Sequence, residues 1–406
     1  FLSSLFYAFP SKKIKVVGVT GTNGKSTTVF YISKILEEAG YRVAVSCSIF
    51  FKIKDEEWQN KLRMTMPGRF FLQSFLKKAV KKGCQYAIIE VTSEGIKQYR
   101  HSFIDFNCAI FTNLYPEHIE AHGSFEKYRQ AKEKLFEKTK TCHILNFDDK
   151  EVSHFLKYKA QKKYFYSLNK ENNYFLGENE KLIQGKILKK TKKGFFLEVG
   201  KERIHLKIPG DFQAYNALAA ISFGLDQNID LKTIKRALEK ISFIPGRMEK
   251  VISQPFEVIV DYAFTPNALE KVYLTLKENL KKKNKMICVL GACGGGRDKW
   301  KRPVLGALAQ KYCQKVIITN EDPYDEDPWE IIKQVAKGSK EAEKILDRRE
   351  AIKKALKMAQ KNDIVIITGK GSEPSICLED GKKIPWDDRQ VVREEFKKLK
   401  INEKEL

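Results

Sequence analysis

The part of this chain best equipped for chemistry is a glycine-rich loop near its start. The loop reads Gly21-Thr22-Asn23-Gly24-Lys25-Ser26-Thr27 and lies between a β-branched run and a segment with helical spacing. Backbone N–H groups in such a loop, together with a helix N-terminus, cradle phosphate oxygens. Lys25 would then reach the β- and γ-phosphates of a nucleotide, and Ser26 would ligate Mg²⁺.

Two features of this loop argue against its prediction as a phosphate loop. Val19 stands where the strict G-x-x-x-x-G-K-[ST] pattern has its first glycine. A Gly-Lys-Ser tripeptide also occurs in ordinary turns, which is the competing interpretation. The position between a buried strand and a helix favours the phosphate loop.

Two further residues that could do chemistry follow apolar runs. Glu90 ends one run, and His118 comes in the loop after the next. Because the carboxyl ends of parallel strands meet at one edge of a sheet, a carboxylate and an imidazole there could share an Mg²⁺ ion. The alternative is that His118, like His122, is an ordinary loop histidine.

The elements that must position these residues alternate between strand and helix. Near-continuous apolar strands separated by helices are typical of a parallel sheet covered on both faces. The expected strands are residues 14–20, 86–91 and 108–112, and the expected helices are residues 27–39, 70–82 and 125–138.

The pattern changes twice further along the chain. Short polar strands with turn signals predict a β-rich subregion over residues 151–208. An apolar helix over residues 216–223 follows, and we place a domain boundary near Phe243. A second alternating series comes after it, with strands at 256–260, 286–290, 316–319 and 364–368 and a helix at 266–280.

Composition limits the class of protein. The 406 residues are 42% hydrophobic, which is enough for sizeable cores in two or three domains. Lys+Arg 75 against Asp+Glu 51 gives a formal net charge of +24, which favours anionic partners. The basic residues are scattered as on a solvated surface, and no recognition helix or aromatic platform is evident, so nucleic acid is not the expected partner.

Cysteine spacing and hydropathy suggest the compartment. The eight cysteines form no CxxC pair, and most lie in apolar runs, so neither a zinc site nor a disulfide framework is expected. No apolar run approaches the roughly 20 residues that span a bilayer. The opening Phe1 to Phe6 segment does not resemble a basic signal leader. We expect a cytoplasmic monomer without a membrane span.

Ordered motifs along nearly the whole chain resemble the Mur ligase family, the ATP-dependent amide-forming enzymes of peptidoglycan synthesis, and most of all its MurE type. The first half carries GVTGTNGKST, EVTSEGIKQYR, FTNLYPEHIEAHG, YRQAKEKLF, NFDD and GDFQAYNALAA. The second half carries IPGRMEKV, VDYAFTPNALE, GACGGGRDKWKRP, DRREAI and GKGSE.

The resemblance implies a domain plan. Residues 11–243 correspond to a central P-loop-type ATPase domain with a mostly parallel sheet and a β-rich subregion. Residues 244–406 correspond to a Rossmann-like domain that brings the amino acid. Residues 1–10 resemble the linker from an amino-terminal UDP-binding domain, so either that domain has been removed or the substrate is anchored differently. Closure of the two domains is expected during the reaction.

The resemblance also implies chemistry: the γ-phosphoryl group of ATP activates a carboxylate as an acyl phosphate, which an amino group then attacks. Such a reaction depends on positioning and charge neutralisation. The residues implied for nucleotide and metal are Gly21 to Thr27 for phosphate, Asn216 for adenine, Asp261 near the ribose, Arg247 for the γ-phosphate, and Ser26, Glu90, His118 and Lys132 for Mg²⁺. Lys132 aligns with a lysine that is carbamylated in many members, although its pattern alone matches a surface lysine like Lys134.

The carboxylate acceptor is implied to be UDP-MurNAc-L-Ala-D-Glu or a similar molecule. The matching residues are Thr65, Ser93 and Arg100. Departures from the family pattern are Met66 for a threonine, Glu94 for a histidine, Gln213 for the first adenine-side asparagine and Phe264 for a histidine.

The incoming amino acid is implied by a short motif. Members that add diaminopimelate carry Asp-Asn-Pro-Arg, and this chain has Glu321-Asp322-Pro323-Tyr324 followed by three acids. Loss of the arginine removes a bidentate carboxylate fork. We therefore expect L-lysine or a relative such as ornithine, with Arg297 on its α-carboxylate and Glu321, Asp322 and Glu373 in the pocket. The competing interpretation is that these acids cap helices, because Asp327 precedes Pro328.

Two alternative functions stay open. A Mur-like ligase of the pseudomurein or polyglutamate type would act on a different acceptor. A catalytically weak homologue would serve as a nucleotide-dependent binding partner, which the presence of Lys25, Glu90, His118 and Lys132 argues against.

Overall fold

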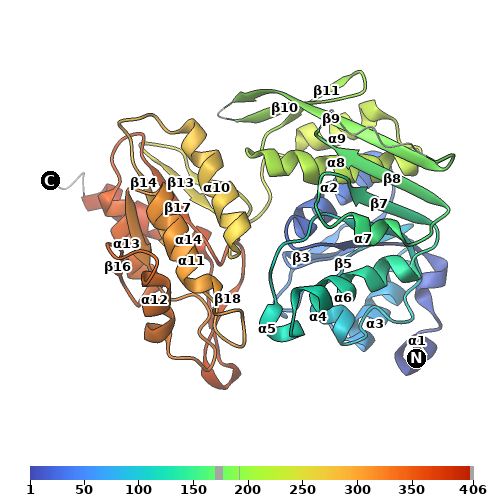
Figure 1. The fold of residues 1–406 in the computed structure, drawn as a ribbon, viewed down its shortest axis with the longest axis horizontal. Coiled ribbons are helices and arrows are strands. Elements are labelled where there is room, and N and C mark those ends of the chain that lie inside the picture. The colour runs from blue at the N-terminus through green and yellow to red at the C-terminus, as the bar shows by residue number, and fades with distance from the viewer. Residues whose placement is uncertain (170–176, 192, 403–406) are drawn as a thin grey trace. The chain divides into compact units, whose positions relative to one another are not determined.

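A computed structural model describes residues 1–169, 177–191 and 193–402 (Figure 1). The chain divides into two compact units. The first comprises Phe1–Pro116 and His122–Ser242, and the second comprises Glu117–Ala121 and Phe243–Leu406. The short helix α5 (Ile119–His122) spans a change from one unit to the other.

An eleven-stranded sheet forms the centre of the first unit, in the order β11-β10-β9-β8-β7-β6-β1-β5-β2-β3-β4. Every neighbouring pair from β9 to β2 is parallel, and the strands at both edges are antiparallel. The mostly parallel sheet expected from the sequence is thereby confirmed. Its strands are β1 (Lys15–Thr20), β2 (Val43–Ser46), β3 (Phe50–Ile53), β4 (Glu56–Gln59), β5 (Tyr86–Glu90), β6 (Phe106–Phe111), β7 (Cys142–Asn146), β8 (Lys162–Ser167), β9 (Glu180–Thr191), β10 (Gly194–Val199) and β11 (Glu202–Leu206).

The β-rich subregion continues this sheet. Strand β9 pairs with β8 in parallel, with Phe165 opposite Leu182, and β10 and β11 then fold back antiparallel. Residues 170–176 and 192 of this subregion lie outside the described residues. Its strands therefore extend the nucleotide-domain sheet rather than forming a separate one.

Helices cover both faces of the sheet. Helices α2 and α8 pack against each other, and α2 contacts β1, β2 and β5, whereas α4 packs against α6, and α6 against β6 (Figure 1). The helices of this unit are α1 (Leu2–Phe6), the 3₁₀ turn η1 (Pro10–Lys13), α2 (Lys25–Glu38), α3 (Arg69–Lys81), α4 (Ser93–Lys97), α6 (Phe125–Lys138), α7 (Ser153–Leu156), α8 (Asp211–Asp226) and α9 (Leu231–Lys240).

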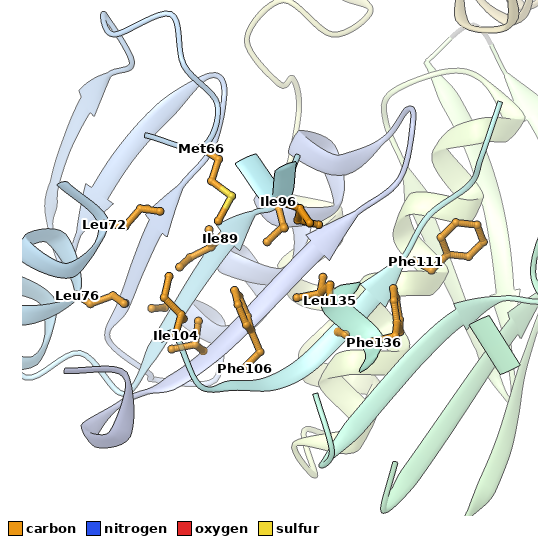
Figure 2. Close-up of a cluster of buried hydrophobic side chains, with 14 of the residues drawn as sticks. Met66, Leu72, Leu76, Ile89, Ile96, Ile104, Phe106, Phe111, Leu135 and Phe136 are labelled. Atoms are coloured by element: carbon orange, nitrogen blue, oxygen red, sulfur yellow. The ribbon is translucent and has the colours of Figure 1, made fainter. Parts of the chain in front are cut away.

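One hydrophobic core lies between the sheet and the face that carries α3, α4 and α6. Side chains from α3 (Leu72 and Leu76) and α6 (Leu135 and Phe136) meet alternate residues of the strands, such as Ile89 (Figure 2). Because successive strand side chains point to opposite faces, the neighbouring strand residues face α2 and α8. Burial on both faces explains why these strands are apolar almost throughout.

The second unit contains a six-stranded sheet in the order β12-β13-β17-β14-β15-β16. Only the β12–β13 pair is antiparallel. Its strands are β12 (Glu249–Ile252), β13 (Glu257–Val260), β14 (Met286–Leu290), β15 (Lys315–Ile318), β16 (Glu343–Lys344) and β17 (Ile364–Ile367), and a separate hairpin pairs β18 (Ser375–Cys377) with β19 (Lys383–Pro385).

Alternating helices cover this second sheet as in Rossmann-like folds. Side chains of α13 and α14 pack on Val258, Val289 and Val365 in one core, and α10, α11 and α12 pack in series. The helices are α10 (Pro266–Asn279), α11 (Lys301–Tyr312), α12 (Pro328–Ala336), α13 (Arg348–Met358), α14 (Asp388–Asn402) and the 3₁₀ turn η2 (Glu379–Gly381).

Candidate active site

The glycine-rich loop joins the end of β1 to the start of α2. Gly24 caps the helix in a left-handed conformation with φ 83°, and a Cβ there would lie 2.2 Å from Asn216 Oδ1. A Cβ on Gly21 would lie 1.9 Å from Thr112 Oγ1. Both positions therefore require glycine, and the turn leaves the helix N-terminus free of a side-chain cap, as phosphate binding needs.

Lys25 turns back over this loop. Its Nζ donates to the carbonyl oxygen of Thr22 at 2.8 Å and to that of Gly21 at 3.1 Å, and lies 3.9 Å from Glu90 Oε1. The amine of Lys25 is thus held at the N-terminus of α2, where it would contact a bound phosphate.

Glu90 is buried at the carboxyl end of β5, with 3% of its surface exposed. Its Oε2 accepts hydrogen bonds from Ser26 Oγ at 2.8 Å and from the backbone N–H of Ser48 at 3.0 Å. Ser26 Oγ also lies 2.8 Å from Ser48 Oγ. The structure therefore brings together Ser26 and Glu90, as expected, and adds Ser48, which sequence reasoning missed although it follows the parallel strand β2.

Lys132 projects from α6 into the same region. Only 2% of it is exposed, and its Nζ donates to Gly21 O at 2.9 Å and lies 4.6 Å from the centre of the Tyr128 ring. Burial first, and then the charge of Lys25, hold the pKa of Lys132 well below its usual range, although Glu90 opposes them. The interpretation of Lys132 as an ordinary surface lysine is wrong.

The oxygen donors around Glu90 suit a hard cation. Ser26 and Glu90 offer a hydroxyl and a carboxylate, the ligands that Mg²⁺ uses together with phosphate oxygens and water. Within the described ranges, no group of three or more His, Cys, Asp or Glu residues could hold a metal ion by themselves. The hydroxyl of Ser26 and the carboxylate of Glu90 fit Mg²⁺ that arrives with a nucleotide, because both are oxygen donors.

Side-chain amides lie on the side of the phosphate loop where the nucleotide base is expected. Asn216 is buried on α8, and its Nδ2 donates to Gln213 Oε1 at 3.1 Å. Asn113 accepts from the backbone N–H of Asn23 at 2.9 Å and returns a bond to its carbonyl at 3.0 Å. Asn113 was missed from the sequence, although it follows β6 at the same sheet edge.

Two of the expected acceptor residues, Ser93 and Arg100, lie on α4 or directly after it. Ser93 is buried, whereas Thr65 is only partly so. The Arg100 guanidinium donates to the carbonyl of Met66 and to the side chain of Gln98. A Cβ at Gly95 would lie 2.5 Å from the Met66 sulfur, so this methionine fills the space beside α4.

Glu94 pairs with a neighbouring histidine. Its Oε1 lies 3.2 Å from His122 Nε2, and the His122 ring packs edge-on against Tyr128 with 5.5 Å between ring centres. The hydroxyl of Tyr128 in turn lies 3.0 Å from Thr22 Oγ1 of the phosphate loop. His118 lies in Glu117–Ala121, the segment that groups with the second unit, so its role as a metal ligand stays a prediction.

In the second unit, Arg247 lies on a sharp turn. Gly246 has φ 63° and donates its N–H to Glu249 Oε2 at 2.8 Å, and the Arg247 guanidinium lies 4.4 Å from the centre of the Tyr262 ring. Asp261 accepts from the backbone N–H groups of Met248 and Ala263, both at 2.7 Å. Burial raises the pKa of Asp261, and its oxygens hold this turn.

The residues expected to receive the amino acid form a buried charge cluster. Lys370 Nζ lies 2.7 and 2.8 Å from the two oxygens of Asp322 and 2.9 Å from Glu373 Oε2. Tyr262 donates to Glu373 Oε1 at 2.9 Å. Burial, and then the charge of Asp322, raise the pKa of Glu321 to about 7. Arg297 is partly buried a few residues before α11.

The three acids after Tyr324 serve the fold. Asp327 caps α12 by accepting from the N–H of Trp329 at 2.9 Å. The Arg302 guanidinium donates hydrogen bonds to the two carboxylate oxygens of Glu326 at 2.9 and 3.1 Å. Asp325 accepts from the N–H of Asp380 at 3.2 Å. These three acids therefore make contacts within the fold, and the helix-capping interpretation of Asp327 is confirmed.

None of the helices within the described ranges is long and apolar enough to cross a membrane.

A phosphate loop with acidic and hydroxyl groups at one sheet edge, followed by a Rossmann-like domain, is the arrangement that a nucleotide-dependent ligase needs. Residues 19–224 match the Mur ligase middle domain, and residues 246–371 match the Mur ligase, glutamate ligase domain. The chain belongs to the Mur ligase family, as its motifs indicated, and is an ATP-dependent amide-forming enzyme of peptidoglycan synthesis.

Similar proteins agree with this assignment. The UDP-N-acetylmuramoyl-L-alanyl-D-glutamate–2,6-diaminopimelate ligase of Syntrophomonas wolfei is 38% identical, across 97% of this chain and 80% of that relative. A solved structure with the same enzyme name has TM-score 0.63 and 29% identity, covering 95% of this chain and 79% of the other. A pseudomurein peptide ligase type C from Methanothermus fervidus shares the fold, with TM-score 0.66, 21% identity and coverages of 95% and 79%.

Proposed function

We propose that this ligase joins a diamino acid, L-lysine in the first place, to the D-glutamyl carboxylate of UDP-MurNAc-L-Ala-D-Glu through an acyl phosphate. The observation that carries the proposal is the cluster of Lys25, Ser26, Glu90 and Lys132 around one phosphate loop. The similarity to MurE-type relatives over nearly the whole chain supports the choice of acceptor.

The phosphate loop would bind and orient the triphosphate of ATP. Its backbone N–H groups and Lys25 neutralise the phosphate oxygens that repel an approaching carboxylate. Ser26 and Glu90 would hold Mg²⁺, which supplies further charge neutralisation when bound. Arg247 from the second unit, and His118 as a further metal ligand, complete the proposed set, and Asn216 and Asp261 would hold the adenosine.

The chemical steps follow from this arrangement. An oxygen of the D-glutamyl carboxylate attacks the γ-phosphorus and ADP leaves. The amino group of the diamino acid attacks the acyl carbon, the bond to the phosphate oxygen breaks, and phosphate leaves as the amine loses a proton. Positioning of the two anions is the main work of the protein.

Lys132 is proposed to act as a carbamate. Burial lowers the pKa of Lys132 and so favours its neutral amine, which is the form that attacks CO₂ and releases a proton. The product carries a negative charge in place of an amine beside Gly21 and near Glu90, which would make Lys132 an oxygen ligand.

The choice of L-lysine rests on Tyr324. A phenol stands where diaminopimelate-adding members have a guanidinium, so a distal carboxylate loses its bidentate partner. A Cβ at Gly295 would lie 2.6 Å from the Tyr324 ring, which places this ring beside the glycine-rich turn that precedes Arg297. Arg297 would hold the α-carboxylate, and Glu321, Asp322 and Glu373 would face the distal ammonium. Asp322 and Glu373 are paired with Lys370, so the ammonium of the substrate would replace Lys370 as a partner of these acids.

The test is phosphate release from ATP and Mg²⁺ with UDP-MurNAc-L-Ala-D-Glu and one amino acid at a time. Release with lysine, a matching product mass, and a loss of about 100-fold or more in Lys25→Ala are expected. Equal rates with diaminopimelate and lysine would refute the selectivity. The absence of release with every amino acid would refute the proposed reaction.

One alternative has a structural reason. Met66 and Glu94 alter the acceptor side, and the Arg100 guanidinium already binds Met66 O and Gln98. A Mur-like ligase acting on a UDP-free acceptor would fit these changes, and turnover of a UDP-free glutamyl peptide in preference to the UDP precursor would establish it.

The proposed working unit is a cytoplasmic monomer with its ATP-binding domain in residues 11–243 and its amino-acid domain in residues 244–406, and residues 1–10 as a linker. The mass measured by light scattering checks the monomer.

A further inference from the structure

Asp148 joins three elements of the first unit at the carboxyl edge of the sheet. Its Oδ1 accepts from Ser167 Oγ at 2.6 Å, and its Oδ2 accepts from the N–H of Leu168 at 2.8 Å and from the Tyr215 hydroxyl at 3.0 Å. Ser167 and Leu168 lie at the end of β8, Asp148 follows β7, and Tyr215 lies in the first half of α8. One carboxylate thus ties two strand ends to a helix.

The neighbours of Asp148 extend the same set of contacts. Asn146 donates to the carbonyl of Thr112 at 2.7 Å, and Asp149 accepts from the N–H of Leu114 at 3.0 Å. Both bonds secure the loop after β6, which also holds Asn23 of the phosphate loop through Thr112 Oγ1 at 2.7 Å. The four residues 146–149 therefore link this edge of the sheet from β6 to β8.

Tyr215 connects this anchor to the phosphate loop. The next residue, Asn216, packs so close to Gly24 that a Cβ there would lie 2.2 Å from its Oδ1. Burial raises the pKa of the Tyr215 phenol, and the charge of Asp148 adds to this, so the hydroxyl stays protonated as a donor. Tyr215 and Asn216 are consecutive residues of α8, and Asp148 contacts this helix through Tyr215. A change at Asp148 would therefore reach Asn216 through α8.

We infer that Asp148 is a positioning residue of the nucleotide-base site: it holds Tyr215 and the end of β8 so that Asn216 faces the base beside Gly24. This inference rests on the proposed nucleotide site. Neither Asp148 nor Tyr215 is required to touch the phosphates, so their loss affects the binding of ATP rather than the chemical step.

The experiment compares Asp148→Ala, Asp148→Asn and Tyr215→Phe in the ligase assay. Because hydrogen bonds to a charged group are lost, KM for ATP is expected to rise about tenfold in Asp148→Ala, with kcat and KM for the acceptor within about twofold. Asp148→Asn, which keeps one acceptor oxygen, should recover part of the loss. Tyr215→Phe should reproduce part of it in a protein with an unchanged core.

A matched control comes from the other end of the same helix. Asp226 also links α8 to β8, because its Oδ1 lies 3.6 Å from Lys162 Nζ, and its Oδ2 accepts from Gln227 at 2.6 Å. The Lys162 contact lies at the start of β8 and the Gln227 contact at the C-terminal end of α8, so Asp226→Asn should change thermal stability and leave KM for ATP as in the wild type. Equal KM effects of Asp148→Ala and Asp226→Asn, or no KM effect in Tyr215→Phe and Asp148→Asn, would overturn the inference.

Direct binding of a fluorescent ATP analogue separates the two proposals. A wild-type protein that binds the analogue and loses binding in Lys25→Ala supports the nucleotide site. If Asp148→Ala and Tyr215→Phe then bind as tightly as wild type, only the positioning role of Asp148 fails. A wild type that does not bind the analogue refutes the nucleotide site itself.

Discussion

Lys132 lies in an environment that is unusual for a lysine. Lys132 has only 2% of its surface exposed, its pKa is held well below its usual range by burial and then by the charge of Lys25, and its amine donates to the backbone of the phosphate loop. Burial of an unpaired cation would be costly, so conversion to a carbamate is a chemically reasonable outcome.

Labelling with ¹³C-bicarbonate tests the carbamate directly. Wild-type protein should give a carbamate carbon signal, and Lys132→Ala should lose it together with most of the ligase activity. Lys134, which is exposed on the same helix, supplies the control, and Lys134→Ala should keep both signal and activity. A signal that persists in Lys132→Ala would show that the carbamate forms elsewhere.

The buried side chain of His101 should make the stability of the protein depend on pH. Burial lowers the pKa of His101 from 6.5 to about 4, and its ring nitrogens have no hydrogen-bond partner among the described residues. Between these two values the unfolded chain binds more protons than the folded one, so stability is lost as the pH falls from 6.5 toward 4. The loss is at most about 3 kcal/mol.

Urea unfolding of His101→Leu checks this sign. The variant should lose less free energy of unfolding than wild type between pH 6.5 and 4.5, because the proton-linked part of the loss is gone. His154→Leu, at a partly exposed side chain, should follow the wild-type curve. Parallel curves for wild type and His101→Leu would contradict the assignment.

At the scale of elements, Asp327 caps helix α12. Asp327 satisfies an N–H of the first turn, and Pro328 follows at the first helical position. Asp327→Ala should lower the free energy of unfolding by about 1 kcal/mol, measured by chemical denaturation. Glu341→Ala, an exposed acid outside the helix, should change it by less. An unchanged stability in Asp327→Ala would refute the cap.

Elements buried on both faces were the most predictable part of the fold. Apolar continuity located β14 over residues 286–290, and helical spacing located α6 over residues 125–138. The pairing of β9 with β8 was not predictable, because partly exposed polar strands carry little information about their partners.

The candidate site was predictable where local sequence determines geometry. The phosphate loop depends on glycines and a helix start, which a sequence shows directly. Burial of Lys132 was missed, although Tyr128, Leu135 and Phe136 lie on the same face of α6 and the spacing contained the signal. Ser48 and Asn113 were missed because their role depends on which strands are neighbours in the sheet.

At the scale of the whole molecule, the proposed binding residues are distributed over two α/β units. The first contains the phosphate loop and the residues proposed for the carboxylate, and the second contains Arg247 and the Lys370 cluster. The proposed reaction uses the residues of both units to form and consume one intermediate, an acyl phosphate. In this mechanism one carboxylate oxygen of the acceptor leaves with the phosphate.

Transfer of an oxygen isotope from the acceptor to phosphate would reveal this intermediate. The acceptor is prepared with ¹⁸O in its D-glutamyl carboxylate and turned over with ATP, Mg²⁺ and L-lysine, and the released phosphate is analysed by mass spectrometry. The proposed mechanism predicts phosphate that carries one ¹⁸O atom for each amide bond formed, and none with Lys25→Ala. Unlabelled phosphate, or AMP carrying the label, would contradict it.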